Sequence, residues 1–180
     1  MATPGSFGHY MDIASKADIA AHLNDVYGSE GLADIGTLVD TYHGRPHPVA
    51  DRDSYGDRFV VIAGFEDFDI SYPLDLGRDE MRYRLALGVG HYVLHYAEPA
   101  MTGEGEVLQV IPYPAPDRLL AEAETFAMGT LMPVSVFTHV LRQFKGTVPE
   151  ANAEISRRFQ VPAEIADVWR DFFDGPRPIE

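Results

Sequence analysis

The sequence DEMRYRLALGVGHYVLHYA at residues 79–97 decides the fold. Apolar and aromatic residues fill it almost continuously, and Asp79 is of a type that caps the N-terminus of a helix. The stretch therefore predicts one long, central helix. We expect this helix to end before Pro99, because the residue that precedes a proline resists the helical conformation.

Helical and strand patterns lie on both sides of this central helix. On the C-terminal side, residues 117–132 (DRLLAEAETFAMGTLM) predict a strong helix that Pro133 closes. A helical tail is expected at 134–173, with helices at 134–144, 149–159 and 162–173. On the N-terminal side, the patterns predict a helical hairpin at 15–43 and a small antiparallel sheet at 58–72, with strands at 59–63 and 67–72. Residues 44–57 are rich in prolines, charges and turn formers, so we expect a loop there.

Size and composition narrow the class of protein. A chain of 180 residues suits one domain, and the patterns predict a mostly helical α+β domain over residues 1–180. The absence of cysteine excludes disulfides, thiolate metal clusters and a cysteine nucleophile. A formal net charge of -14 disfavours direct binding to nucleic acid and suits a basic protein partner. Because the chain shows neither a membrane-length apolar run nor a basic, apolar leader, we expect a cytoplasmic protein with no membrane contact.

The most specific signal is a pair of motifs, RYRLALGVGHYVLH at residues 82–95 and EAETFAMGTLMP at residues 122–133. The pair resembles the ImmA/IrrE family (DUF955 type) of zinc metallopeptidase-like proteins, whose approximate patterns are R-F-x-L-A-H-E-L-G-H-Y-L-L-H and E-A-N-x-F-A-x-x-L-L-M-P. Two separate blocks agree in the right order. The matching residues are Arg82, Tyr83, Leu85, Ala86, Gly90, His91, Tyr92, Leu94 and His95, and then Glu122, Ala123, Phe126, Ala127, Leu131, Met132 and Pro133. The resemblance implies a zincin-like, specifically gluzincin-like, fold.

The chain departs from this family at the positions that carry the chemistry. An HExxH helix places two histidines one turn apart to hold zinc, and its glutamate takes a proton from the metal-bound water. The corresponding residues here are LGVGH at 87–91, so Leu87 stands at the first ligand position and Gly88 at the general-base position. His91 and the third-ligand position, Glu122, remain as a vestigial pair. As inherited, this degenerate motif should not hydrolyse peptides.

Two arrangements of the remaining polar residues stay open. In one, His91 bonds to Glu122 between two helices and His95 bonds a backbone carbonyl. In the other, His91 and His95, spaced i and i+4, form a shifted zinc site with Glu122, although a full turn moves a metal by about 5 Å along the helix. We also expect Tyr92 and Glu124 to line the cleft. No cofactor is expected, although zinc at the vestigial site stays open.

These observations support three hypotheses about function. The first is a pseudoenzyme, a catalytically degenerate ImmA/IrrE-like protein that binds a protein partner. The resemblance implies a regulatory role in a phage or mobile-element context, with a basic DNA-binding regulator as the partner. The second is an active zinc metallopeptidase with a rearranged site made of His91, His95 and Glu122. The third is a structural or assembly subunit.

Overall fold

The computed structural model describes residues 32–50, 56–103 and 105–174, which form an α+β protein. Its regular helices are α2 (Ile35–Thr41), α4 (Arg78–Tyr92), α5 (Glu98–Thr102), α6 (Asp117–Leu131), α7 (Val134–Gln143), α8 (Val148–Phe159) and α9 (Ala163–Asp174). Its strands are β1 (Gly44–Val49), β2 (Val60–Gly64), β3 (Asp67–Pro73) and β4 (Val110–Ile111). A short 3-10 turn, η1 (Gly56–Arg58), precedes β2, and a π-helical turn, η2 (Val93–Ala97), joins α4 to α5.

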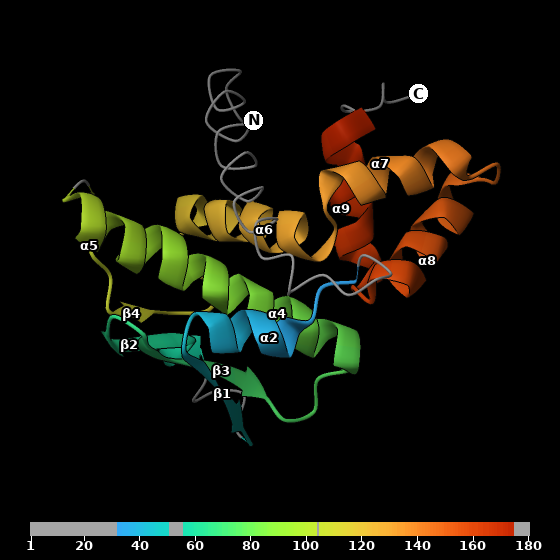
Figure 1. Cartoon of the computed structure of the whole chain (residues 1–180). Coiled ribbons are helices and arrows are strands. Elements are labelled where there is room, and N and C mark those ends of the chain that lie inside the picture. Colours follow the sequence, from blue (N-terminus) through green and yellow to red (C-terminus); the bar gives the residue numbers. More distant parts are fainter. Residues whose placement is uncertain (1–31, 51–55, 104, 175–180) are drawn as a thin grey trace.

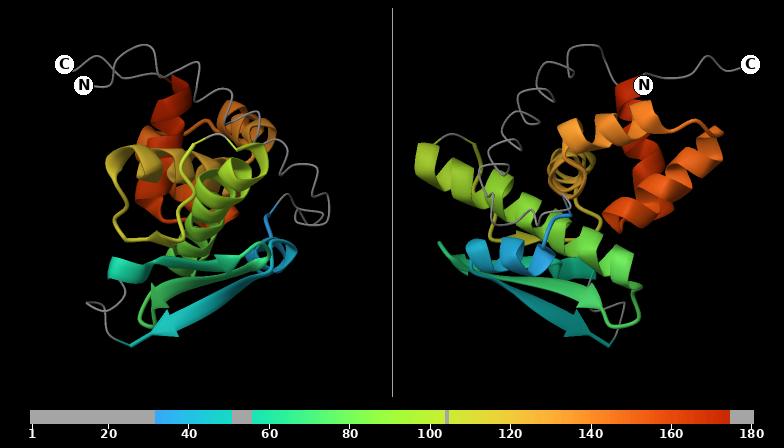
Figure 2. Two further views of the ribbon diagram at one scale, coloured as in Figure 1. Left: turned by 90° about the vertical axis from the view of Figure 1, so that its left-hand side faces the viewer. Right: turned by 45° about the vertical axis from the view of Figure 1, so that its right-hand side comes forward.

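The elements form layers around α4. The sheet lies against one side of α4 and α6 lies against the other, while α2 runs beside α4 over the same face of the sheet (Figures 1 and 2). Helices α7, α8 and α9 gather at the N-terminal end of α4 (Figure 1). From Arg82 to Tyr92, every residue of α4 except Arg84 is buried. The prediction of a central helix is therefore confirmed.

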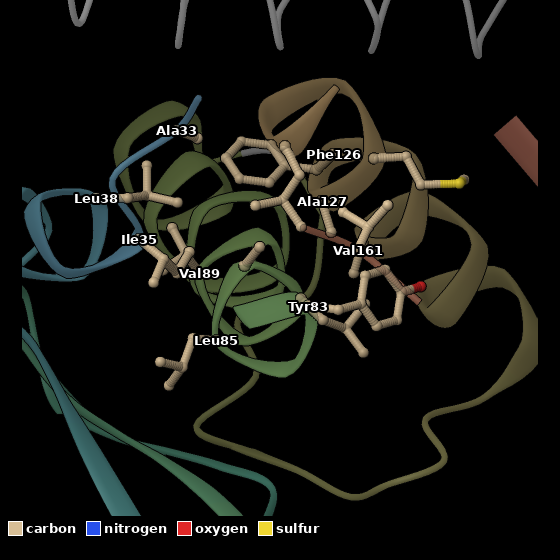
Figure 3. Close-up of a cluster of buried hydrophobic side chains, with 14 of the residues drawn as sticks. Ala33, Ile35, Leu38, Tyr83, Leu85, Val89, Phe126, Ala127 and Val161 are labelled. Carbon is tan, nitrogen blue, oxygen red and sulfur yellow. The ribbon is translucent and has the colours of Figure 1, made fainter. Parts of the chain in front are cut away.

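Side chains from separate segments meet around α4 in one apolar core. Leu85 and Val89 face α2, whereas Phe126 and Ala127 cover α4 from the side of α6 (Figure 3). The helices of the tail add a second group of aromatic rings around Trp169, which is fully buried. The Trp169 indole N–H donates to the carbonyl of Met132 over 3.1 Å, so α9 is fixed to the end of α6.

The helix after residue 79 begins and ends differently from the prediction. Gly77, not Asp79, occupies the N-cap position, and Asp79 lies in the first turn. Beyond α4 the helix does not stop before Pro99 but continues through η2 to Thr102. In an α-helix the carbonyl of His95 would accept from residue 99, but a proline has no N–H. The backbone N–H of Leu108 donates to that carbonyl instead, over 2.9 Å, and the π-turn carries the helix past the proline.

The sheet has the order β1-β3-β2-β4 and is mixed, not antiparallel. Strand β1 pairs with β3 in parallel, with Arg45 opposite Asp69 and His47 opposite Ser71. The two other pairs, β2 with β3 and β2 with β4, are antiparallel. The predicted strands at 59–63 and 67–72 are confirmed within a residue or two as β2 and β3.

Strand β1 lies where we expected a loop, so that prediction is wrong for residues 44–49. The strand tolerates Pro46 and Pro48 because it is an edge strand, paired with β3 alone. The Val49 carbonyl accepts from the Leu74 N–H on the β3 side, and backbone groups alternate in direction along a strand. The nitrogens of Pro46 and Pro48 therefore face away from β3, and neither proline interrupts the ladder.

The predicted hairpin at 15–43 falls only partly within the described residues. Its first helix lies outside them. The second is shorter than expected, because Asp34 caps α2 by accepting from the N–H groups of Gly36 and Thr37. Of the helices in the described ranges, none combines the length and the apolar character needed to cross a membrane.

Candidate functional site

The candidate site lies where α4 and η2 meet α6. Gly90 allows this close approach, because a β-carbon at residue 90 would lie 3.0 Å from both the Ala123 carbonyl oxygen and the Phe126 ring. Gly90 therefore serves the packing of α4 against α6. This approach brings the start of α6 to the last turn of α4, where the polar side chains lie.

Three polar side chains form a continuous hydrogen-bonded chain between these helices. The Nδ1 atoms of His91 and His95 lie 3.0 Å apart, and Nε2 of His95 lies 3.0 Å from Oε2 of Glu122. His91 is fully buried and His95 nearly so. At the outer end, the exposed Arg118 guanidinium lies 3.7 Å from Glu122, one helical turn along α6. The predicted bond between His91 and Glu122 is thus wrong, because His95 stands between them and His91 bonds His95.

The hydrogen-bonding partners fix a direction for this chain. A carboxylate only accepts, so His95 must donate through its Nε2–H to Glu122. Burial lowers the pKa of His95 even though Glu122 opposes the shift, so His95 is neutral and its Nδ1 accepts. His91 then donates through its Nδ1–H. Burial, with the nearby His95, lowers the pKa of His91 to about 3, which keeps this imidazole neutral as well.

At the inner end of this hydrogen-bonded chain, His91 has a nitrogen that can accept a hydrogen bond but has no donor beside it in the part of the protein that the structure describes. With its proton on Nδ1, His91 presents an unprotonated Nε2, and this buried atom has no hydrogen-bond partner within the described residues. The ring of Phe59 packs edge-on against the imidazole, with 5.9 Å between ring centroids. An unpaired, buried polar atom costs about 1–3 kcal/mol, so the unpaired Nε2 of His91 lowers the stability of the folded protein.

The three side chains do not fit a zinc ion as they stand. A tetrahedral site requires that each ligand atom point at one centre. His95 uses opposite sides of its ring for His91 and Glu122, so no single point is shared by all three. Across residues 32–50, 56–103 and 105–174, no three His, Asp or Glu side chains are grouped so as to hold a metal ion.

Leu87 and Gly88, which stand where an HExxH motif would carry its first ligand and its general base, serve the core. Leu87 is fully buried within the apolar cluster around α4. Gly88 faces β3, and a β-carbon there would lie 2.5 Å from Cγ2 of Ile70 and 2.9 Å from its Cγ1 and Cδ1. Real β-carbons essentially never approach other atoms this closely. The role of Gly88 is thereby explained, because the ideal position of a side chain at residue 88 is already filled by the sheet.

The two other residues expected in the cleft lie elsewhere. The Tyr92 ring stacks on Phe68 of the sheet, with 4.0 Å between centroids, and its hydroxyl accepts from the backbone N–H of Glu66. Glu124 follows Glu122 by two residues, which places it on another face of α6. It lies with Tyr83 and Arg84, nearly two turns before His91 on α4. The structure thus separates both residues from the hydrogen-bonded chain.

Sequence reasoning did not identify Arg118, and it placed Glu124 in the cleft instead of beside Tyr83. The spacing of Arg118 and Glu122 was an available signal, because residues four apart on a helix are neighbours. No comparable signal links Tyr83, Tyr113 and Glu124, which come from three separate segments. Comparison with known proteins adds nothing to the site: no protein-family model matches the chain, and a search of curated proteins finds no similar sequence.

Proposed function

We propose that this protein is a non-hydrolytic relative of the ImmA/IrrE metallopeptidases, with a zincin-like fold, that acts by binding another protein. The observation that carries the proposal is the packing of Leu87 and Gly88. At the first ligand position stands a fully buried leucine, and the room for a general base is taken by Ile70. A general base contributes about 10²–10⁴-fold to a rate, so a protein without one has little hydrolytic capacity to preserve.

The hydrogen-bonded chain supports the same proposal. His91, His95 and Glu122 are hydrogen-bonded to one another in sequence instead of directing their free electron pairs at one centre. The chain joins α4 to α6 and includes a charge-assisted bond that is largely shielded from water, since the Glu122 side chain is only 12% exposed. Residues that would serve chemistry in a peptidase thus serve here as a polar link between helices.

A basic protein partner fits the charge of the molecule. The chain has 28 acidic and 14 basic residues, and complementary charge speeds association and selects against acidic partners. By analogy with the resembled family, the partner is a DNA-binding regulator, and the setting is a phage or mobile element in the cytoplasm. Direct nucleic-acid binding is not part of the proposal, because phosphates repel such a surface.

Metal analysis tests the catalytic half of the proposal. The protein is purified without chelator or nickel, and its zinc content and hydrolysis of unfolded casein are measured beside those of His91→Ala and Glu122→Ala. We expect well under one zinc per chain in all three proteins, and no cleavage. One zinc per chain that both substitutions remove, together with cleavage, would overturn the proposal.

Co-purification tests the binding half. The protein is co-expressed with candidate basic DNA-binding regulators, and any complex is weighed by light scattering. We expect a complex of defined stoichiometry whose regulator stays intact. A regulator that elutes apart at micromolar concentrations argues against this partner, and a cleaved one argues for a peptidase.

A rearranged zinc peptidase is the second candidate, and two observations favour it. His91, His95 and Glu122 already lie in sequence at 3.0 Å separations, and His95 lies in a π-turn, a feature frequent at functional sites. Zinc binding there would require the His95 ring to turn so that one nitrogen served the shared centre. Zinc lost on His95→Ala, with casein cleaved, would select this candidate. If the protein binds neither zinc nor a regulator, the third hypothesis remains, namely a structural or assembly subunit.

A further inference from the structure

A small pocket lies apart from the hydrogen-bonded chain, where α4, α6, the start of α9 and the segment before α6 meet. It holds about 170 Å³. Its lining is polar and aromatic and includes Tyr83, Arg84, Tyr113, Glu124 and two residues at its exposed edge, Glu80 and Glu164. Sites for drug-sized molecules are larger, at about 300–1,000 Å³, so the size of this pocket suits a single side chain.

The pocket carries more acidic than basic side chains, which favours a cation. Its lining has three carboxyl groups, those of Glu80, Glu124 and Glu164, and one guanidinium, that of Arg84, whose buried Nη1 has no hydrogen-bond partner within the described residues. The Arg84 guanidinium is already stacked on the Tyr113 ring, with its carbon 3.7 Å from the ring centroid. Burial raises the pKa of Glu124, although the Tyr83 hydroxyl and the Arg84 guanidinium beside it oppose this shift.

A buried hydroxyl in the lining points independently to a missing ligand. Tyr83 is 6% exposed, and its hydroxyl oxygen has no partner of good hydrogen-bond geometry in the described part of the chain, although Glu124 lies near enough to affect its pKa. The Tyr83 ring extends from α4 past Val161 with its hydroxyl turned away from the helix (Figure 3). A phenol oxygen accepts from an ammonium or guanidinium group, and such a group would satisfy it.

We propose that this pocket receives one lysine or arginine side chain of a basic protein partner. The inference rests on the proposed binding function and deepens it, since it names the place where the partner's charge is read. The carboxylates of Glu80 and Glu164 attract the cationic group at the edge, and the half-buried Glu124 and the Tyr83 hydroxyl bind it further in.

Short peptides with one variable residue test the pocket directly. Ac-Gly-X-Gly-NH₂, with X as Arg, Lys, citrulline or Glu, is titrated into the isotope-labelled full-length protein and followed by NMR. We expect millimolar binding of the Arg and Lys peptides, with shifts concentrated at the amides of Tyr83, Tyr113 and Ile165. Citrulline has the shape of arginine without its charge and should bind at least five-fold more weakly. An equal affinity for citrulline, tighter binding of the Glu peptide, or shifts spread over the surface would overturn the inference.

Matched variants separate the pocket from general electrostatics. Glu80→Gln with Glu164→Gln should weaken the Arg peptide about five-fold, a size expected of two partly exposed ion pairs. Glutamine keeps an oxygen that can accept from the Gly77 N–H, so the start of α4 is preserved. The control, Glu66→Gln with Glu106→Gln, makes the same change of charge at exposed positions outside the pocket and should leave affinity unchanged. An equal effect of both pairs would overturn the inference.

Tyr83→Phe supplies a second readout. It removes the unpartnered hydroxyl, so the free protein should be as stable as the wild type or more so, while the Arg peptide binds more weakly. An unchanged affinity would exclude the hydroxyl from the site. A regulator that still binds the Glu80/Glu164 double variant with full affinity would refute the pocket while leaving the proposed function intact.

Discussion

Substituting alanine for Gly88 tests the packing of α4 against β3 at the position where the resembled family carries its general base. Two effects oppose each other. Alanine in the middle of a helix gains about 1 kcal/mol over glycine. Against this, the new β-carbon would lie 2.5 Å from Ile70, whereas carbon atoms pack at about 3.5–4.0 Å, so the sheet or the helix must move by about 1 Å. Ile70 is fully buried, which places the cost near the upper end of the usual 1–3 kcal/mol for overpacking. We expect a net loss of about 2 kcal/mol.

The assay is urea unfolding, followed by fluorescence of the single tryptophan, Trp169, and by circular dichroism. A double-mutant cycle with Ile70→Ala isolates the contact, because that substitution removes all three crowding atoms. In the Ile70→Ala background, Gly88→Ala should gain about 1 kcal/mol, which gives a coupling of about 3 kcal/mol. Gly64→Ala is the control, since a β-carbon at Gly64 meets nothing within 4 Å, and it should cost no stability.

The reasoning would be refuted if Gly88→Ala stabilised the wild-type protein, or if its cost were the same with and without the Ile70 side chain. Either result would mean that residue 88 has room for a side chain. The case against a general base at this position would then rest on sequence alone.

Three further predictions concern the polar side chains of His91, Arg82 and Asp34. The unfolded state takes up a proton at His91 near pH 6.5, whereas the folded state does so only near pH 3, so the wild-type protein should lose stability as the pH drops. Urea titrations at pH 7 and pH 5 should show a loss about 2 kcal/mol larger for the wild type than for His91→Gln. Arg82 donates to two backbone carbonyls from separate segments, so Arg82→Met should lower the free energy of unfolding by about 3 kcal/mol. Calorimetry measures this loss, and a value under about 1 kcal/mol would contradict the prediction. Asp34→Ala should lower the free energy of unfolding by about 1 kcal/mol at pH 7, because it removes the cap of α2. Hydrogen bonds from Thr37 lower the pKa of Asp34, so the difference in stability between wild type and variant should shrink as the pH falls below 3.8.

The helices were predictable because each carries its own signal in the sequence. Apolar spacing, Pro133 and the break at Val161 and Pro162 placed helices at 117–132, 134–144, 149–159 and 162–173, and the structure confirms all four within a residue or two. Strand β1 was not predictable in the same way. Its prolines are acceptable only at the edge of a sheet, and that position depends on pairing with β3, which lies some twenty residues further along the chain.

The sequence predicts which residues meet at the site, but not how they are hydrogen-bonded to one another. The spacing of His91 and His95 and the matching block around Glu122 identified the three residues that meet. Which nitrogen faces which neighbour depends on the π-turn after Tyr92 and on how closely α6 approaches Gly90. Both follow from contacts between distant segments, and a pattern in one helix does not contain them.

The outward nitrogens of Pro46 and Pro48 have a consequence for how this chain meets other chains. An open strand edge is a template for aggregation because a foreign strand can dock on its free N–H groups. Along β1, two successive outward positions offer no hydrogen to donate, and Gly44 is left as the other outward donor within the strand. A second copy laid along this edge would leave an acceptor unpaired opposite each of the two prolines. The edge should therefore resist strand addition, and the protein is protected from growing into fibres from this side without any covering helix.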